Sequence, residues 1–185
     1  MGSRARRGEG RRDWSTMTNS VRRPELLVAW VLAAAVTAVD QLTKSLAVSR
    51  LSDGAVDVVW TLKFRLTYNT GMAFGAGSSI GPVIAVGAFL IVLVLARSVS
   101  RQPRLAYRIA IGTLVGGATG NLLDRIFRSP GVLRGAVVDF IDFGWFPVFN
   151  VADIAINVGA GLLILTVFLD SRRSRSSGES VTNDR

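Results

Sequence analysis

The stretch Ser79–Ala96 reads SIGPVIAVGAFLIVLVLA, and it belongs to a longer run, Leu66–Ala96, that contains no charged residue. A helix needs about 20 apolar residues to cross roughly 30 Å of hydrocarbon, because each residue adds about 1.5 Å. The sequence therefore predicts an all-α integral membrane protein with four transmembrane helices, since three further apolar blocks approach this length: Leu26–Val48, Leu105–Leu123 and Ala152–Leu169.

The basic residues are distributed unevenly around these blocks. Fifteen of the 22 Lys and Arg residues precede the first block, flank the connection between the second and third, or follow the fourth. Basic residues concentrate on the cytoplasmic side of membrane proteins. The pattern predicts cytoplasmic termini and two external connections, and it favours membrane lipid over nucleic acid as the partner of the +9 charge.

Composition also indicates the domain organisation. Residues 1–24 and 171–185 are polar and rich in Arg and Ser, which is typical of disordered segments. We expect a basic N-terminal extension, one membrane domain over residues 25–170, and a cytoplasmic tail.

The chain contains no cysteine and no histidine. Disulfides, thiol nucleophiles and Ser-His-Asp arrangements are therefore excluded. If the protein is an enzyme, its proton-transfer groups are carboxylates, Lys or Tyr.

The first external connection alternates apolar and polar residues from Val58 to Tyr68. Alternation with period two predicts a strand with one apolar face. A turn at Asn69–Gly71 allows Met72–Gly75 to return as a partner strand. We expect a small extracytoplasmic β-sheet, a β-cradle, in this connection.

Polar side chains gather at the external end of the predicted spans, where such groups are costly. Each has a structural interpretation: Asn150 can cap a helix, and Asp124 can pair with Arg125. A row of glycines in the third block, Gly112, Gly116 and Gly120, predicts close contact with the fourth block. The cluster then indicates a shared site, formed by Asp40, Lys44, Asn69, Asn121, Asp124, Arg125, Asn150 and Asp153, with Asn157 one turn deeper.

Two carboxylates held together cannot both ionise cheaply, so one keeps its proton while the other acts as a base. We expect Asp124 and Asp153 to form this pair. Asp139 and Asp142 are the other carboxylates that could share in catalysis. Asp139 is interpreted as a structural anchor of the second external connection, and Asp142 is left unassigned.

Five segments, in order, resemble the bacterial lipoprotein signal peptidases, or signal peptidase II: DQLTK at 40–44, NTGMAFG at 69–75, GNLLDR at 120–125, VVDF at 137–140 and FNVAD at 149–153. The resemblance implies a membrane aspartic endopeptidase that cleaves prolipoproteins just before a diacylglyceryl-modified cysteine. It implies Asp124 and Asp153 as the catalytic pair, supported by Asn121, Asn150, Asp40, Lys44, Asn69, Gly71 and Arg125.

The resemblance further implies a location in the bacterial cytoplasmic membrane, with the active site near its outer face. It implies inhibition by globomycin and no metal or organic cofactor, and we expect a monomer.

The main alternative is a small proton-coupled transporter, which would carry polar residues at several depths. A Ser/Lys peptidase using Lys44 is disfavoured because Asp40, one turn away, keeps that lysine charged.

Overall fold

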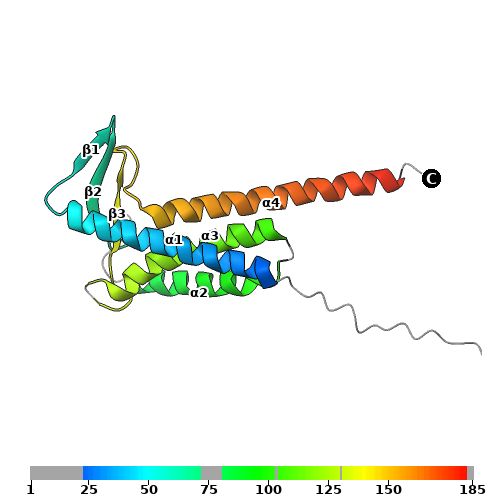
Figure 1. The fold of residues 1–185 in the computed structure, drawn as a ribbon, viewed down its shortest axis with the longest axis horizontal. Helices are drawn as coiled ribbons and strands as arrows, with labels where there is room; N and C mark the ends of the chain where they lie inside the picture. The colour runs from blue at the N-terminus through cyan, green and yellow to red at the C-terminus, as the bar shows by residue number, and fades with distance from the viewer. Residues whose placement is uncertain (1–22, 72–80, 103, 130, 183–185) are drawn as a thin grey trace, which may run out of the picture.

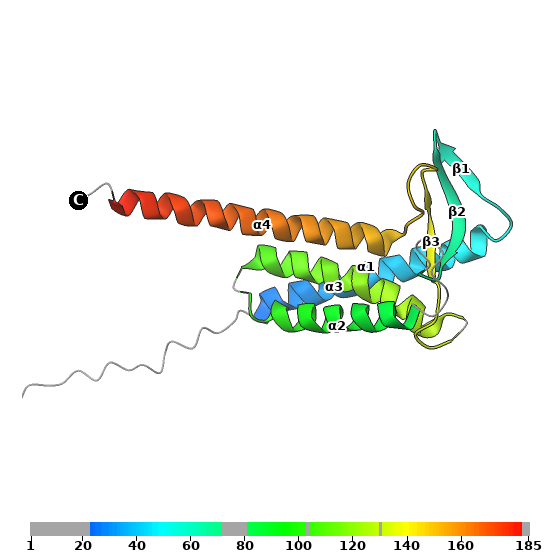
Figure 2. The ribbon, with the colours of Figure 1, turned by 180° about the vertical axis from the view of Figure 1, so that it is seen from behind.

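The computed structural model describes residues 23–71, 81–102, 104–129 and 131–182. The described residues form four helices and three strands. The helices lie side by side, and the small sheet crosses one end of the bundle (Figures 1 and 2). Residues 1–22 of the expected N-terminal extension, and the expected strand Met72–Gly75, lie outside the described residues. The helices are α1 (Arg23–Arg50), α2 (Gly81–Val99), α3 (Leu105–Phe127) and α4 (Val151–Thr182).

Three of the four helices are long and apolar enough to cross a membrane by length and composition: Glu25–Arg50, Gly81–Val99 and Val151–Arg173. The expected third span, α3, does not meet that measure. It packs against α1, α2 and α4, and about half of its residues are buried. A helix surrounded by protein needs fewer apolar side chains, because little of it contacts lipid.

Glycines determine how closely the helices approach. A Cβ at Gly112 or Gly116 would lie 2.6 Å or 2.7 Å from the carbonyl oxygens of Ala29 and Ala33 on α1. The predicted glycine row therefore faces α1, and its assignment to α4 was wrong. Contact between α3 and α4 does occur, through Gly117 and Gly159.

The sheet has three antiparallel strands in the order β1–β2–β3. Strands β1 (Val56–Val59) and β2 (Leu62–Asn69) form a hairpin, so the single strand predicted over this region was wrong. Trp60 takes a left-handed backbone conformation, with φ of 51°, and turns the chain there. The third strand, β3 (Val137–Asp142), comes from the second connection.

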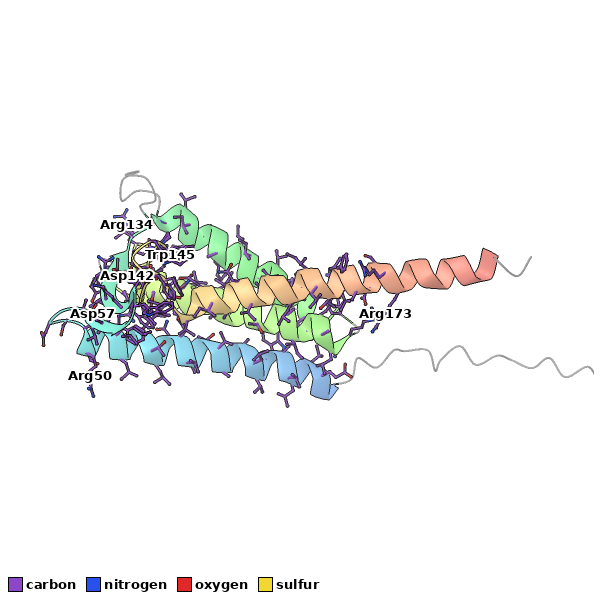
Figure 3. All side chains as sticks on the ribbon, turned by 90° about the horizontal axis from the view of Figure 1, so that it is seen from above. Arg50, Asp57, Arg134, Asp142, Trp145 and Arg173 are labelled. Carbon is purple, nitrogen blue, oxygen red and sulfur yellow. The ribbon has the colours of Figure 1, made fainter. Side chains whose placement is uncertain are left out.

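The sheet lies at one end of the bundle, and the described ends of the chain lie at the other (Figure 1). In Figure 3, Arg50, Asp57, Asp142 and Trp145 gather at the sheet end, while Arg173 lies toward the opposite end. Helix α4 continues to Thr182, past the expected end of the fourth span at Leu169. A helix satisfies its own backbone hydrogen bonds, so it can continue beyond the hydrocarbon into polar sequence.

Candidate active site

A buried lysine links α1 to α3 at the sheet end of the bundle. Lys44 Nζ lies 2.8 Å from Asp40 Oδ2 and 3.0 Å from Asp124 Oδ2, and all three side chains are almost fully buried. Lys44 Nζ also donates to Asn121 Oδ1 at 2.7 Å. Buried charges are stable only when paired, and this cluster pairs one cation with two carboxylates.

Further donors complete the surroundings of Asp124. Arg128 Nε lies 2.7 Å from Asp124 Oδ1, and the backbone N–H of Val138 donates to Asp124 Oδ2 at 3.0 Å. Both carboxylate oxygens therefore have partners: two cations, a backbone N–H and the side-chain amide of Gln41, which donates to Oδ1 at 3.3 Å. Asp124 thus joins α1, α3 and β3, and its hydrogen-bond and ion-pair partners among the described residues do not include Asp153.

Asp40 attaches the start of α4 to α1. Its Oδ1 accepts a 2.9 Å hydrogen bond from the backbone N–H of Ala152, in the first turn of α4. The first N–H groups of a helix have no intrahelical partner, so a carboxylate there satisfies one of them. A Cβ at Gly120 would collide with the Asp40 carboxylate, so glycine gives Asp40 its space.

Two asparagines extend the network from Lys44 to a second pair of carboxylates. Asn121 Nδ2 donates to Asp153 Oδ1 at 2.8 Å, and Asn150 Nδ2 donates to Asp139 Oδ1 at 2.6 Å. The backbone N–H of Asn150 also donates to Asp153 Oδ2 at 3.2 Å. Asn150 therefore contacts both Asp139 and Asp153, which brings these two acids together at one residue.

Asp139 is a buried carboxylate with no cation in direct contact in the described part of the chain. Its side chain accepts hydrogen bonds from Asn69 and Asn150, and the residue is 2% exposed. Burial raises the pKa of Asp139 to about 6, and the nearby Asp153 adds to the rise, although the two hydrogen bonds act to lower it. The surroundings of Asp139 thus favour its protonated form.

Asp139 and Asp153 open onto a groove between α2, α3 and α4. This first groove has a volume of about 320 Å³, and polar residues line the end nearest the sheet: Asn69, Asn121, Arg125, Asp139 and Asp153. Apolar residues line its remainder, along α2 down to Leu95 and along α3 to Leu114. Asp124 does not line it. The first groove therefore has two acidic side chains at the end nearest the sheet and an apolar lining along the rest of its length.

Arg125 and Gly71 shape the polar end of the first groove. Arg125 is 7% exposed, and its Nη1 has no hydrogen-bond partner among the described residues. Gly71 has φ of 85°, which favours glycine, and its N–H donates to Asn69 Oδ1 at 2.9 Å. A Cβ at Gly71 would lie 3.6 Å from Arg125 Nη1 and 2.8 Å from Ile84 Cδ1.

The structure thus gathers every predicted site residue at one end of the bundle, but it divides the carboxylates into two groups. Asp40 and Asp124 surround Lys44, whereas Asp153 lies with Asp139. Asp139, interpreted from the sequence as an anchor, lies with Asp153 although it was not included in the predicted cluster. Its signal was a lone carboxylate inside the apolar run Ala136–Phe140. Among the described residues, no three acidic side chains gather closely enough to hold a metal ion.

Comparisons with known proteins show the family of the chain. The family model described as signal peptidase (SPase) II matches residues 32–169. Lipoprotein signal peptidases of Rhodococcus jostii and Streptomyces coelicolor are each 41% identical, over 77% and 82% of this chain and 73% and 74% of their own lengths.

The fold is also similar to that of a bacterial membrane enzyme determined by the in meso method at 1.9 Å resolution. The TM-score is 0.67 at 30% identity, over 76% of this chain and 92% of that one. The family model covers most of the chain, and both relatives carry the name lipoprotein signal peptidase. The chain belongs to the signal peptidase II family.

Proposed function

We propose that this protein removes the signal peptide from prolipoproteins as a membrane aspartic endopeptidase, with Asp139 and Asp153 as the catalytic pair. The observation that carries the proposal is the position of Asn150, which donates to both acids at the polar end of the first groove. The substrate class follows the names of the relatives, which are lipoprotein signal peptidases.

The contacts favour Asp139 over Asp124 as the partner of Asp153. A carboxylate that contacts the two cations Lys44 and Arg128, as well as a backbone N–H, is stabilised in its ionised form. Asp139 has amide donors only and lines the groove. We therefore replace the expected Asp124–Asp153 pair with Asp139 and Asp153, and assign Asp124 a positioning role.

The reaction follows from one proton shared between two acids. The ionised carboxylate takes a proton from water, whose oxygen attacks the scissile carbonyl carbon, while the protonated carboxyl donates to the carbonyl oxygen. The resulting diol collapses, the C–N bond breaks, and a proton passes to the leaving amine. The raised pKa of Asp139 suits it to hold the proton before attack.

The positioning residues keep this pair in place. Lys44 donates a hydrogen bond to Asn121, and Asn121 donates one to Asp153. Asp40 accepts a hydrogen bond from the first turn of α4. The orientation of Asp153 therefore depends on α1 and α3. Such support matters because displacements of about 1 Å can reduce turnover strongly.

The proposal includes the membrane arrangement. All four helices span the bacterial cytoplasmic membrane as a monomer, with α3 enclosed by the other three, both termini in the cytoplasm, and the sheet at the outer face. The acid pair then lies near the outer face, and the apolar part of the first groove reaches into the hydrocarbon. That groove suits the acyl chains of a diacylglyceryl-modified cysteine.

Cleavage of a synthetic precursor tests this function. Purified protein in mixed micelles is expected to cut a prolipoprotein peptide just before its diacylglyceryl-modified cysteine, and to leave the unlipidated peptide intact. Mass spectrometry of the products locates the cut. Equal cleavage of both peptides, or cleavage at another bond, contradicts the proposed substrate.

A further inference from the structure

A second groove lies beneath the loop that joins β3 to α4. It has a volume of about 490 Å³, and Phe146–Phe149 from the loop cover one side while Asp153, Ile154, Asn157 and Val158 from α4 line the other. Figure 1 shows this loop beside the first turns of α4. Asp153 is the residue that the first and second grooves share.

The loop provides an aromatic wall for the second groove. The rings of Phe146 and Phe149 meet edge to face with centroids 5.8 Å apart, and Phe143 stacks on Phe149 at 5.9 Å. These contacts hold the wall in position. Trp145 and Phe146 remain largely exposed, at 76% and 51%, so the groove is flanked by aromatic surface of the kind found at membrane interfaces.

Asn157 places an amide in the wall of this groove. Its Nδ2 donates to the carbonyl oxygen of Asp153 at 2.8 Å, and its Oδ1 has no hydrogen-bond partner among the described residues. The residue is exposed and lies between the apolar residues Ile154 and Val158. An exposed amide inside an apolar span is costly unless a partner pairs with it.

The two grooves differ in the chemistry they can accept. Acyl chains make no hydrogen bonds, and the deep part of the first groove is lined by apolar residues. A peptide carries an N–H and a C=O at each residue, and each costs several kcal/mol if unpaired in hydrocarbon, by order of magnitude. The amide of Asn157 offers a partner for such groups close to Asp153.

We propose that the second groove binds the signal-peptide segment preceding the cleaved bond, and that Asn157 hydrogen-bonds its backbone. This inference rests on the proposed function. The precursor then straddles α4 at Asp153, with its acyl chains in the first groove and its signal peptide in the second. Asn157 is a substrate-binding residue in this arrangement, one turn away from the acid pair.

Kinetics of Asn157→Leu test the inference. Two substrates are compared that share the diacylglyceryl-modified cysteine, one with a full signal peptide and one truncated to two residues before the cut. Loss of one hydrogen bond is expected to raise KM for the full substrate about three- to tenfold, with kcat within about twofold and the truncated substrate unaffected. Thr166→Val, farther along α4 and outside both grooves, is the matched control.

Unchanged KM for the full substrate, or equal changes for both substrates, would overturn the inference while leaving the proposed function intact. Failure of the unmodified protein to cut either substrate would overturn both. A photo-cross-linking amino acid provides a second measurement. At Val158 it is expected to capture the signal peptide, and at Ile91, in the first groove, the acyl chains. Capture of acyl chains at both positions would also overturn the inference.

Discussion

The side-chain amide of Asn150 donates a 2.6 Å hydrogen bond to Asp139, and both residues are buried, at 0% and 2% exposure. A carboxylate in that position has lost its water and has gained amide donors in place of a cation. This environment favours the neutral acid more than the cluster around Lys44 does. The pH dependence of stability and the choice of catalytic pair both depend on this difference between Asp139 and the cluster around Lys44.

The pH dependence of stability should reveal Asp139. Its pKa is raised from 3.8 to about 6 in the folded protein, so the folded state keeps a proton that the unfolded state loses. The stabilisation is complete below about pH 4 and is lost as pH rises to about 6, a change on the order of 3 kcal/mol. Thermal unfolding in detergent, scanned from pH 4 to 7.5, should show this loss in the unmodified protein and not in Asp139→Asn.

Asp142→Asn is the matched control, because Asp142 lies on the same strand. The N–H of Gly144 donates to it at 2.7 Å, and this hydrogen bond, together with Arg65, lowers the pKa of Asp142. Stability contributed by Asp142 is therefore lost as pH falls, in the opposite direction. Identical pH profiles for Asp139→Asn and the unmodified protein would contradict the assignment.

Removing the cation at Lys44 should destabilise the bundle. Lys44→Met leaves Asp40 with no cation and Asp124 with Arg128 alone, and breaking a buried pair typically costs about 3–5 kcal/mol. We expect a markedly lower Tm in detergent. Lys63→Met is the control, because Lys63 pairs with Asp57 on the exposed hairpin and its loss should leave Tm unchanged. Equal Tm values for Lys44→Met and Lys63→Met would argue against a stabilising role of the buried ion pairs of Lys44.

The close approach of α3 and α4 can be tested at Gly117. A Cβ there would lie 2.5 Å from the carbonyl oxygen of Ala152 and 3.0 Å from Ile156, so Gly117→Ala should cost about 1–3 kcal/mol through overpacking. Because Ala152 is two residues from Asn150, we also expect reduced turnover. Gly87→Ala on α2 is the control, because a Cβ there has no other heavy atom within 4 Å. This substitution should leave the free energy of unfolding unchanged or slightly raised. Equal tolerance of both substitutions would contradict this packing.

The absence of cysteine from the sequence makes the membrane topology easy to test. Asp57 and Arg173 lie at opposite ends of the molecule (Figure 3). In intact spheroplasts, a membrane-impermeant maleimide should label Asp57→Cys, and it should label Arg173→Cys only after permeabilisation. Labelling of both positions from outside would rule out the proposed orientation with four spans.

Hydrophobic run length predicted the helices well because crossing hydrocarbon imposes a minimum length. The position of the glycine row did not reveal its neighbour, because close approach requires small residues whichever helix faces them. Gly112 and Gly116 meet α1, and only the fold shows that. The hairpin was missed because the alternation of apolar and polar residues continues through Trp60, where the backbone reverses direction. The pattern of side chains alone does not show that reversal.

The site was predicted as a set of residues, and its internal pairing was not. Sequence spacing places Asp124 and Asp153 at the right end of their helices, but it does not show which cations reach them. Lys44 and Arg128 contact Asp124, whereas Asp139 on β3 is linked to Asp153 on α4 through Asn150. Which carboxylate keeps its proton is decided by such contacts between distant segments.

Turnover of a lipidated precursor by Asp139→Asn, Asp153→Asn and Asp142→Asn tests the central claim most directly. The account predicts that the first two variants lose nearly all kcat, by about a thousandfold or more, while binding substrate and remaining folded. Asp142→Asn should keep near-normal kcat. A near-normal rate in Asp139→Asn would contradict the proposed pair.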